Sequence, residues 1–156
     1  IIDEIKDTSA NCRRLGSISS IPCASRAYVA KHGLPMSPDE LMQHNCLVID
    51  YHNMPGAGDW VFYRGRERSH AKVTGNLKIN NVQLINELVM QGHGIALQPE
   101  FLIQEQIDSG ELVHVLPEYS MPAVSFYLIY LERNNLSPKL RVTIDFLVDC
   151  FESIGD

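Results

Sequence analysis

The stretch that decides the fold is NLKINNVQLINELVMQGHGIALQPEF, residues 76–101. After a short alternating segment come Asn80 and Asn81, and then a run of apolar residues at helical spacing. Gly92 is placed to end that helix, and the short apolar segment 94–97 is typical of a buried strand. The stretch therefore predicts a helix that begins at the two asparagines and leads into a buried strand.

The two asparagines allow two interpretations. Asparagine is a common N-cap, whose side chain satisfies an N–H group of the first helical turn. In open α/β sheets, however, ligands bind beyond the carboxyl ends of strands, where helix N-termini favour carboxylate or phosphate groups. Ser25 repeats this arrangement after the strand residues Cys23 and Ala24. Spacing alone leaves both interpretations open at each position.

Strands and helices alternate along the rest of the chain. Strands are predicted at 17–24, 46–51, 60–63, 71–79, 112–116 and 124–131. Helices are predicted at 26–32, from Ser37, at 99–109 and from Pro138, the last with an apolar stripe of Leu140, Ile144, Leu147, Val148 and Phe151. This order predicts an α/β fold with a largely parallel sheet.

Two local patterns add detail to these elements. Pro22 lacks the N–H group that a strand interior uses, so it restricts the first strand to an edge or a bend. Ser37, followed three residues later by Glu40, has the pattern of a capping box at a helix start.

Composition describes a folded domain without a nucleic-acid-binding surface of its own. The chain has 156 residues, 45% of them hydrophobic and 21% charged, with a formal net charge of −6. Nucleic-acid affinity needs clustered Lys and Arg, which this balance does not favour. Arg64, Arg66 and Arg68 form a short basic run that fits the solvated tip of a hairpin.

The four cysteines fit reduced thiols in a cytoplasmic protein. Cys12, Cys23, Cys46 and Cys150 show no C-x-x-C pairing, and a chain of this length with an ordinary core does not need disulfides. Two bridges remain arithmetically possible, and an exported receptor would favour them. No apolar run is long enough to span a membrane, and residues 1–4 do not resemble a signal peptide.

No pattern for catalysis, metal binding or a cofactor is present. His44 and Cys46 come closest to metal-ligand spacing, but no second pair follows at a zinc-finger distance. The serines lack the G-x-S-x-G turn of hydrolases, and the glycine pairs lack the third glycine of a dinucleotide turn. We therefore expect a binding protein with no catalytic residues, no metal and no cofactor.

Seven motifs follow one another along the chain: CASRAYVAKHG (23–33), PDEL (38–41), HNCL (44–47), VTGNL with Asn80 (73–80), GHGIALQP (92–99), GELVHVLP (110–117), and LSPKLR with IDFL (136–147). In this order they resemble the effector domain of LysR-type transcriptional regulators. Each motif alone is weak, but their order and spacing cover residues 12–151. Gln98 departs from the family, which commonly has leucine there.

The resemblance implies the fold of type 2 periplasmic binding proteins, in which two Rossmann-like subdomains are joined by two crossover strands. Residues 1–22 would then be a remnant of the first effector subdomain and residues 23–125 the second. Residues 126–156 would supply the return strand and helix of the first. The family's winged helix-turn-helix domain would lie N-terminal to this chain.

The resemblance also implies a function. The expected role is sensing of a small anionic molecule, carboxylate-bearing, in the cleft between the subdomains of a homodimer or homotetramer that binds duplex DNA through the winged domain. The implied effector-binding residues are Ser25, Asn80, Asn81, Val82, Ile95 and Gln98. The alternative is a solute-binding receptor or an enzyme on the same fold.

Overall fold

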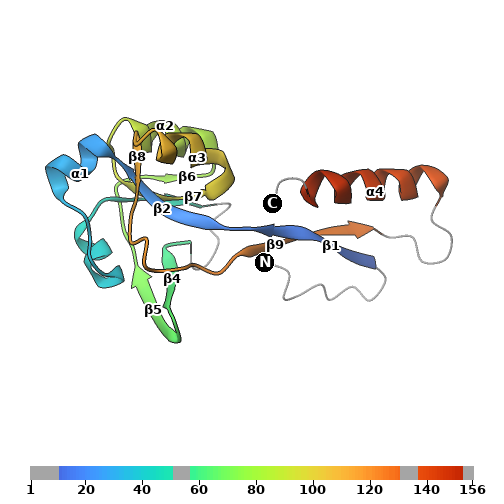
Figure 1. Cartoon of the computed structure of the whole chain (residues 1–156), viewed down its shortest axis with the longest axis horizontal. Coiled ribbons are helices and arrows are strands. Elements are labelled where there is room, and N and C mark those ends of the chain that lie inside the picture. The colour runs from blue at the N-terminus through green and yellow to red at the C-terminus, as the bar shows by residue number, and fades with distance from the viewer. Residues whose placement is uncertain (1–10, 51–56, 131–136, 153–156) are drawn as a thin grey trace. The chain divides into compact units, whose positions relative to one another are not determined.

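The computed structural model describes residues 11–50, 57–130 and 137–152 (Figure 1). The chain divides into two compact units. One is continuous, Ser19–Pro122, and the other combines the two ends of the chain, residues 1–18 and 123–156.

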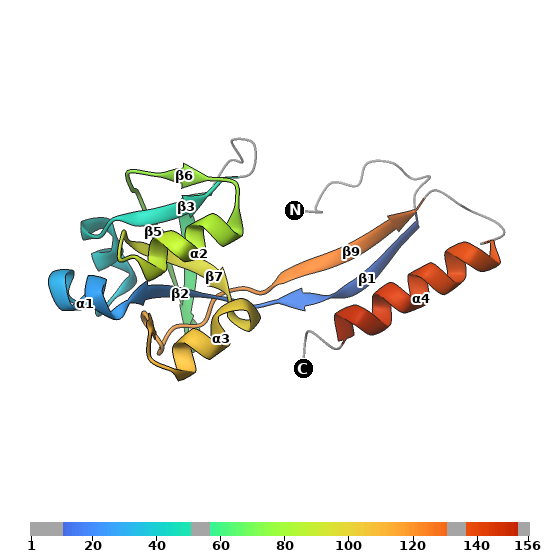
Figure 2. The same cartoon turned by 90° about the horizontal axis from the view of Figure 1, so that it is seen from above.

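The continuous unit is built on a five-stranded sheet with the order β6-β3-β7-β2-β8 (Figure 2). Its strands are β2 (Ser20–Ser25), β3 (Cys46–Ile49), β6 (Lys78–Ile79), β7 (Ile95–Pro99) and β8 (Leu112–His114). β3 runs parallel to β6 and β7, whereas β2 runs antiparallel to both of its neighbours. The sheet therefore has an amino end, where β3, β6 and β7 begin, and a carboxyl end, where they finish.

Two helices cover one face of this sheet: α2 (Val82–Met90) and α3 (Glu100–Asp108). Their apolar faces pack on the sheet in one cluster, formed by Cys23, Leu47, Ile85, Val89, Ala96, Ile103 and Leu112. The helical spacing of residues 82–89 correctly predicted the buried face of α2, because Ile85 and Val89 are fully buried.

Shorter elements cover the other face. They are α1 (Arg26–His32), the 3-10 helix η1 (Pro38–Gln43), and a hairpin of β4 (Asp59–Arg64) and β5 (Glu67–Lys72). Tyr28, Leu41, Trp60, Phe62 and Ile95 lie in the cluster that they bury. The basic run forms the tip of the hairpin, as predicted, with Gly65 at a positive φ of 63°.

The unit made of the chain ends contains β1 (Asn11–Ile18), β9 (Val124–Tyr130) and α4 (Pro138–Glu152). β1 and β9 form an antiparallel pair, and α4 packs on β1. Ile144 and Val148 of the predicted stripe are buried, and the Phe151 ring lies 6.0 Å from the Phe126 ring. The stripe is therefore the packing face of α4.

The prediction that Pro22 lies at a sheet edge or a bend is wrong. β2 is an interior strand, between β7 and β8. The Pro22 carbonyl oxygen accepts a hydrogen bond from the Val115 N–H at 2.8 Å, one residue beyond the end of β8. The N–H group that proline lacks would face the same side, so the proline is tolerated where the neighbouring strand has already ended.

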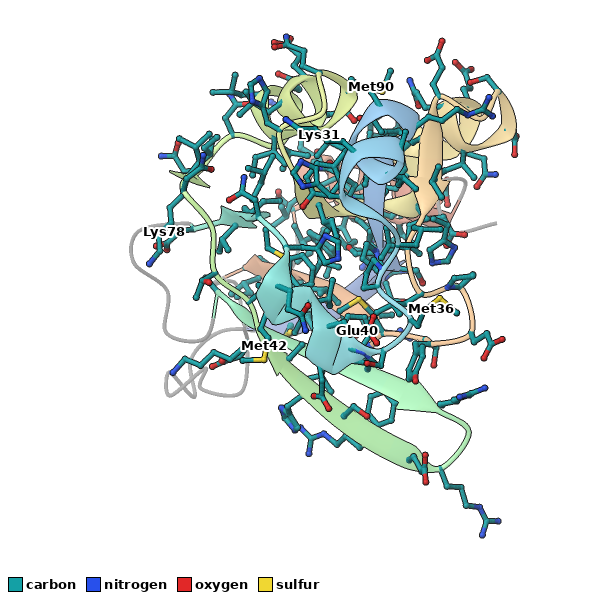
Figure 3. All side chains as sticks on the ribbon, turned by 90° about the vertical axis from the view of Figure 1, so that its left-hand side faces the viewer. Lys31, Met36, Glu40, Met42, Lys78 and Met90 are labelled. Atoms are coloured by element: carbon teal, nitrogen blue, oxygen red, sulfur yellow. The ribbon has the colours of Figure 1, made fainter. Side chains whose placement is uncertain are left out.

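Two further local predictions are corrected. Segment 71–79 is not one strand, because β5 ends at Lys72 and β6 begins only at Lys78. Ser37 precedes η1 rather than an α-helix, and its side chain makes no capping bond. The Glu40 carboxylate accepts instead from the Met36 N–H at 2.9 Å (Figure 3). A 3-10 turn closes each bond over fewer residues than an α-helix, so the geometry of a capping box is not reached.

Candidate functional site

The carboxyl end of the five-stranded sheet collects several polar groups. β6 finishes at Ile79 and is followed by Asn80, Asn81 and then α2. β7 finishes at Pro99 and leads directly into α3. Two helix N-termini therefore lie at the end of the sheet where open α/β proteins bind ligands.

Of the two asparagines, only Asn81 caps the helix. Its Oδ1 accepts a hydrogen bond from the Leu84 N–H at 3.0 Å, and the residue has the extended backbone of an N-cap. Asn80 stands one residue earlier and is exposed. Val82, the first residue of α2, is half-buried. Both asparagines remain accessible at the helix start, so the cap and the ligand interpretations are compatible at Asn81.

Gln98 is the most unusual polar residue at this end. Its side chain is fully buried, and neither Oε1 nor Nε2 has a hydrogen-bond partner within the described parts of the chain. Gln98 pairs with Ile21 across β2 and β7 and lies two residues after Ala96, so it faces the helix-covered side. Leaving a buried polar group unpaired costs about 1–3 kcal/mol. The sequence signalled Gln98 only as a departure from the family pattern.

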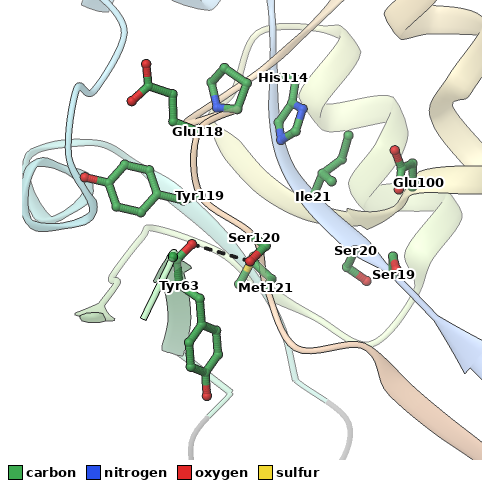
Figure 4. A pocket seen from close by; sticks show the side chains of 12 residues that line it. Ser19, Ser20, Ile21, Tyr63, Glu100, His114, Glu118, Tyr119, Ser120 and Met121 are labelled. Atoms are coloured by element: carbon green, nitrogen blue, oxygen red, sulfur yellow. Dashed lines mark hydrogen bonds between the residues drawn. The ribbon is translucent and has the colours of Figure 1, made fainter. Parts of the chain in front are cut away.

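A pocket of about 380 Å³ also opens at the carboxyl end (Figure 4). It is lined by the start of β2, by Glu100 of α3, by His114 of β8 and by residues of the 117–121 segment. The His114 Nε2 atom is buried and has no partner among the described residues. Burial lowers the pKa of His114, and the negative charge of Glu100 partly opposes this shift. No sequence signal marked this pocket, because His114 and Glu100 come from separate elements.

The structure does not bring Ser25 and Ile95 to the carboxyl end. β2 runs antiparallel to β7, so Ser25, its last residue, lies at the amino end, where Ile95 begins β7. Ser25 is 4% exposed, and its Oγ accepts from the Tyr28 N–H at 3.2 Å to cap α1. Ile95 is fully buried in the core. The grouping of these two residues with Asn80, Asn81, Val82 and Gln98 in one site is therefore corrected.

At the amino end, the Asn45 side-chain amide links separate backbone segments through hydrogen bonds. Asn45 Nδ2 donates to Asn76 Oδ1 at 2.9 Å and to the His93 carbonyl oxygen at 2.6 Å. Its Oδ1 accepts from the Asn76 N–H at 2.9 Å. Cβ atoms at Gly75 and Gly94 would overlap the carbonyl oxygens of Cys46 and Asn45. The glycines of the sequence motifs therefore permit close backbone approach.

His44, Cys23 and Cys46 are titratable groups of this unit whose surroundings suit a structural role. The Tyr28 hydroxyl lies 3.2 Å from His44 Nδ1, and the pKa of His44 is lowered first by burial and then by nearby His32. Burial raises the pKa of both Cys23 and Cys46 to about 12. These two thiols belong to different clusters on opposite faces of the sheet. They are suited to packing rather than to reaction.

The described residues contain neither a metal-binding cluster nor a membrane-spanning helix. No group of three or more His, Cys, Asp or Glu side chains there could hold a metal ion. None of the helices in those ranges is long and apolar enough to cross a membrane.

Comparison with known proteins identifies relatives over nearly the whole chain. A family model described as LysR substrate binding domain matches residues 1–151. The chain is 39% identical over 140 residues to the HTH-type transcriptional regulator DmlR of Escherichia coli, covering 89% of this chain and 45% of DmlR. It is 36% identical over 136 residues to the HTH-type transcriptional activator TtdR of the same species, covering 86% and 43%. The chain thus spans a little under half the length of these relatives.

A solved structure agrees with the sequence relatives. The regulatory domain of CrgA, a LysR-type transcriptional regulator from Neisseria meningitidis, matches with a TM-score of 0.78 and 27% identity. The match covers 95% of this chain and 72% of the CrgA domain. The predicted α/β fold of the type 2 periplasmic-binding-protein kind is confirmed, and the curated relatives are regulators rather than enzymes. The chain belongs to the LysR substrate-binding-domain family.

Proposed function

We propose that this chain is the effector-sensing part of a bacterial LysR-type transcriptional regulator. Its family membership and its regulator relatives support this role and do not favour a solute receptor or an enzyme. In this proposal the two compact units are the two effector subdomains, residues 1–18 with 123–156 as the first and Ser19–Pro122 as the second, which moves the boundaries expected from the sequence at 22/23 and 125/126. Duplex DNA is bound by a winged helix-turn-helix domain N-terminal to these residues, in a homodimer or homotetramer in the cytoplasm.

The effector site of this unit is formed at the carboxyl end by Asn80, Asn81, Val82 and Gln98. The observation that carries this assignment is Gln98, whose buried amide has no partner in the described residues. A sensor can retain such a costly group if a ligand, directly or after a small rearrangement, satisfies it. Ser25 and Ile95 have structural roles instead, as a helix cap and a core residue.

The effector carries a carboxylate. The first turn of α2 presents N–H groups that the helix does not use, together with the positive end of the helix dipole. The Asn81 side chain accepts a hydrogen bond from one of these N–H groups, so the others remain available to bind an anion. A side-chain amide such as that of Gln98 can donate to a second oxygen of the ligand.

Effector binding acts by shifting populations. A ligand that binds one arrangement of the two effector subdomains better than another favours that arrangement by its difference in affinity. In an oligomer the favoured arrangement changes how the DNA-binding domains are presented, which couples effector binding to DNA binding.

The experiment is calorimetric titration of the chain with acetate, succinate, glutarate and benzoate. Asn81→Asp keeps a good cap but places a negative charge at the anion site, so we expect the affinity of each binding carboxylate to fall about tenfold. Gln43→Glu serves as the control. It makes the same amide-to-carboxylate change at the exposed last residue of η1, away from the site.

Two results would contradict the proposed site. One is equal carboxylate affinity in the Asn81→Asp variant and the wild-type chain. The other is an equal loss in Asn81→Asp and Gln43→Glu, which would mean that net charge rather than position determines binding.

A further inference from the structure

The pocket at the carboxyl end lies wholly within the unit Ser19–Pro122. Its lining combines hydroxyl groups of Ser19, Ser20 and Ser120 with the carboxylate of Glu100 and the ring of His114 (Figure 4). The pocket lining includes neither Asn81 nor Gln98. The lining therefore shares no residue with the carboxylate site proposed at the start of α2.

The charges of the lining are negative. Two carboxylates line the pocket, Glu100 and Glu118, and no Lys or Arg belongs to the lining. Arg64 pairs with Glu118 and balances its charge. Glu100 has no ion-pair partner among the described residues, so one net negative charge remains in the pocket. That charge attracts a cation and repels the carboxylates that suit the start of α2.

His114 adds a hydrogen-bond acceptor. Because burial lowers its pKa, the imidazole is neutral near pH 7. In the tautomer with the proton on Nδ1, the buried and unpartnered Nε2 atom can accept a hydrogen bond from a ligand after a small rotation of the ring toward the pocket. An ammonium group donates up to three hydrogen bonds and accepts none, so it matches a carboxylate, an imidazole nitrogen and serine hydroxyls.

One aromatic ring of the lining contacts a cation that itself lies outside the lining. The Arg64 guanidinium lies over the Tyr119 ring, with its central carbon 5.6 Å from the ring centroid. Tyr63 and Tyr119 both line the pocket, and the faces of aromatic rings attract cations.

The wall formed by residues 116–121 is held in place before any ligand arrives. Leu116 has a positive φ of 58°, which is uncommon for a residue other than glycine. Its carbonyl oxygen accepts from the Tyr119 N–H at 3.0 Å. Tyr63 and Ser120 exchange two backbone hydrogen bonds, at 2.8 and 2.9 Å. A fixed wall lowers the ordering cost of binding.

We propose that this pocket binds a small organic ammonium compound, with Glu100 and His114 as the groups that recognise its charged nitrogen. The site is distinct from the carboxylate site proposed at the start of α2, and a LysR-family domain with both would respond to two ligands of opposite charge.

Three compounds with the same four-carbon skeleton test the proposal: putrescine, butane-1,4-diol and succinate. The whole chain is titrated with each compound by NMR, which gives both the affinity and the location of binding. We expect putrescine to shift the amide signals of residues 19–21 and 114–121, and the diol to leave them unchanged. Succinate is expected to leave these signals unchanged whether or not it binds at Asn81, which keeps the two proposals separable.

Two variants identify the recognising groups. Glu100→Gln removes the charge but keeps the shape, and we expect putrescine to bind about fivefold more weakly. His114→Phe keeps a ring of similar size without the acceptor nitrogen and is expected to weaken binding to a similar extent. Glu105→Gln removes one negative charge from an exposed position of the same helix and serves as the control.

Several results would overturn the proposal. They are equal shifts by putrescine and the diol, shifts located outside the pocket, no binding of putrescine at millimolar concentration, or equal weakening by Glu100→Gln and Glu105→Gln. The last result would show that putrescine affinity depends only on the chain's net charge of −6 and not on the position of Glu100.

Discussion

The two ends of the five-stranded sheet are built differently. At the amino end, the Ser25 hydroxyl, both atoms of the Asn45 amide and the Tyr28 hydroxyl all have hydrogen-bond partners. Near the carboxyl end of β7, both atoms of the Gln98 amide are buried and lack partners within the described residues, as does the Nε2 atom of His114 at the end of the short strand β8. Polar side chains therefore form hydrogen bonds at one end, whereas two polar side chains at the other end have buried atoms without partners in the described residues.

This difference supports the proposed placement of the ligand site at the carboxyl end. Buried polar groups are nearly always paired in folded proteins, so the unpaired amide of Gln98 needs a reason, as do the single unpaired atoms Asn86 Oδ1 in α2 and Gln106 Oε1 in α3. Binding supplies one, because a ligand can pair with such groups directly or after a small rearrangement. Five predictions test the contrast between the ends, from the largest expected effect to the smallest.

The amino end tolerates the least change of shape. A Cβ atom at Gly75 would overlap the Cys46 carbonyl oxygen in the backbone of β3. We expect Gly75→Ala to lower the free energy of unfolding by about 3 kcal/mol, measured by urea denaturation. Gly16→Ala is the control, because a Cβ there meets only the Phe151 carbonyl oxygen at 3.9 Å. Equal stability of the two variants would mean that the amino end is loosely packed.

Removing the amide at the amino end should be destabilising. Asn45→Ala deletes three hydrogen bonds, to Asn76 and to the His93 carbonyl oxygen. At about 1 kcal/mol for each bond, partly offset by new water contacts, we expect a loss of about 2 kcal/mol in urea denaturation. A loss below about 0.5 kcal/mol would show that these bonds contribute little.

Removing the amide at the carboxyl end should have the opposite sign. Gln98→Met keeps the length of the side chain but deletes two buried polar atoms that lack partners in the described residues. We expect the free energy of unfolding to rise by about 1 kcal/mol without ligand. Carboxylate affinity should fall in the same variant. A destabilised Gln98→Met protein would mean that the amide is satisfied in solution and that the contrast between the ends is wrong.

The two helix caps should cost the same stability but differ in function. Ser25→Ala and Asn81→Ala each remove one capping bond, and each should lower the free energy of unfolding by about 1 kcal/mol. Asn80→Ala should leave stability almost unchanged, because Asn80 is not the cap. In calorimetric titration Asn81→Ala and Asn80→Ala should both change carboxylate affinity, because both residues belong to the proposed site, whereas Ser25→Ala should not. An equal change in Ser25→Ala would return the amino end to consideration as a ligand site.

The smallest effect concerns pH and is shared by the two ends. Burial lowers the pKa of His44 at the amino end and of His114 at the carboxyl end. Below about pH 6.5 the unfolded chain therefore takes up protons that the folded chain does not. Stability should fall as the pH decreases from 7.5 to 5.5. His44→Asn and His114→Phe should each reduce that slope in urea denaturation, and an unchanged slope in both would contradict the assigned burial.

The sequence by itself determined the class of fold and most of its elements. The spacing of apolar residues and the residues that begin or end a helix are local properties of the sequence. The apolar spacing of residues 82–89, the cap at Ser25 and the stripe on α4 therefore all follow from neighbouring residues. The order of seven motifs also identified the family by resemblance, and two glycines within them, Gly75 and Gly94, lie where a Cβ atom would overlap a neighbouring carbonyl oxygen. Local rules failed at Pro22 and at Ser37, where the outcome depended on a neighbouring strand and on a 3-10 turn.

Only the tertiary structure decided which residues share a site. Ser25 and Asn81 have the same local pattern, a polar cap after a strand, yet the antiparallel course of β2 places them at opposite ends of the sheet. Glu100 lies outside the motifs, and the motif that contains His114 signals no site, yet both residues line one pocket because β8 and α3 lie close together. Strand direction and the pairing of distant segments arise from long-range packing, which residue spacing along the chain does not record.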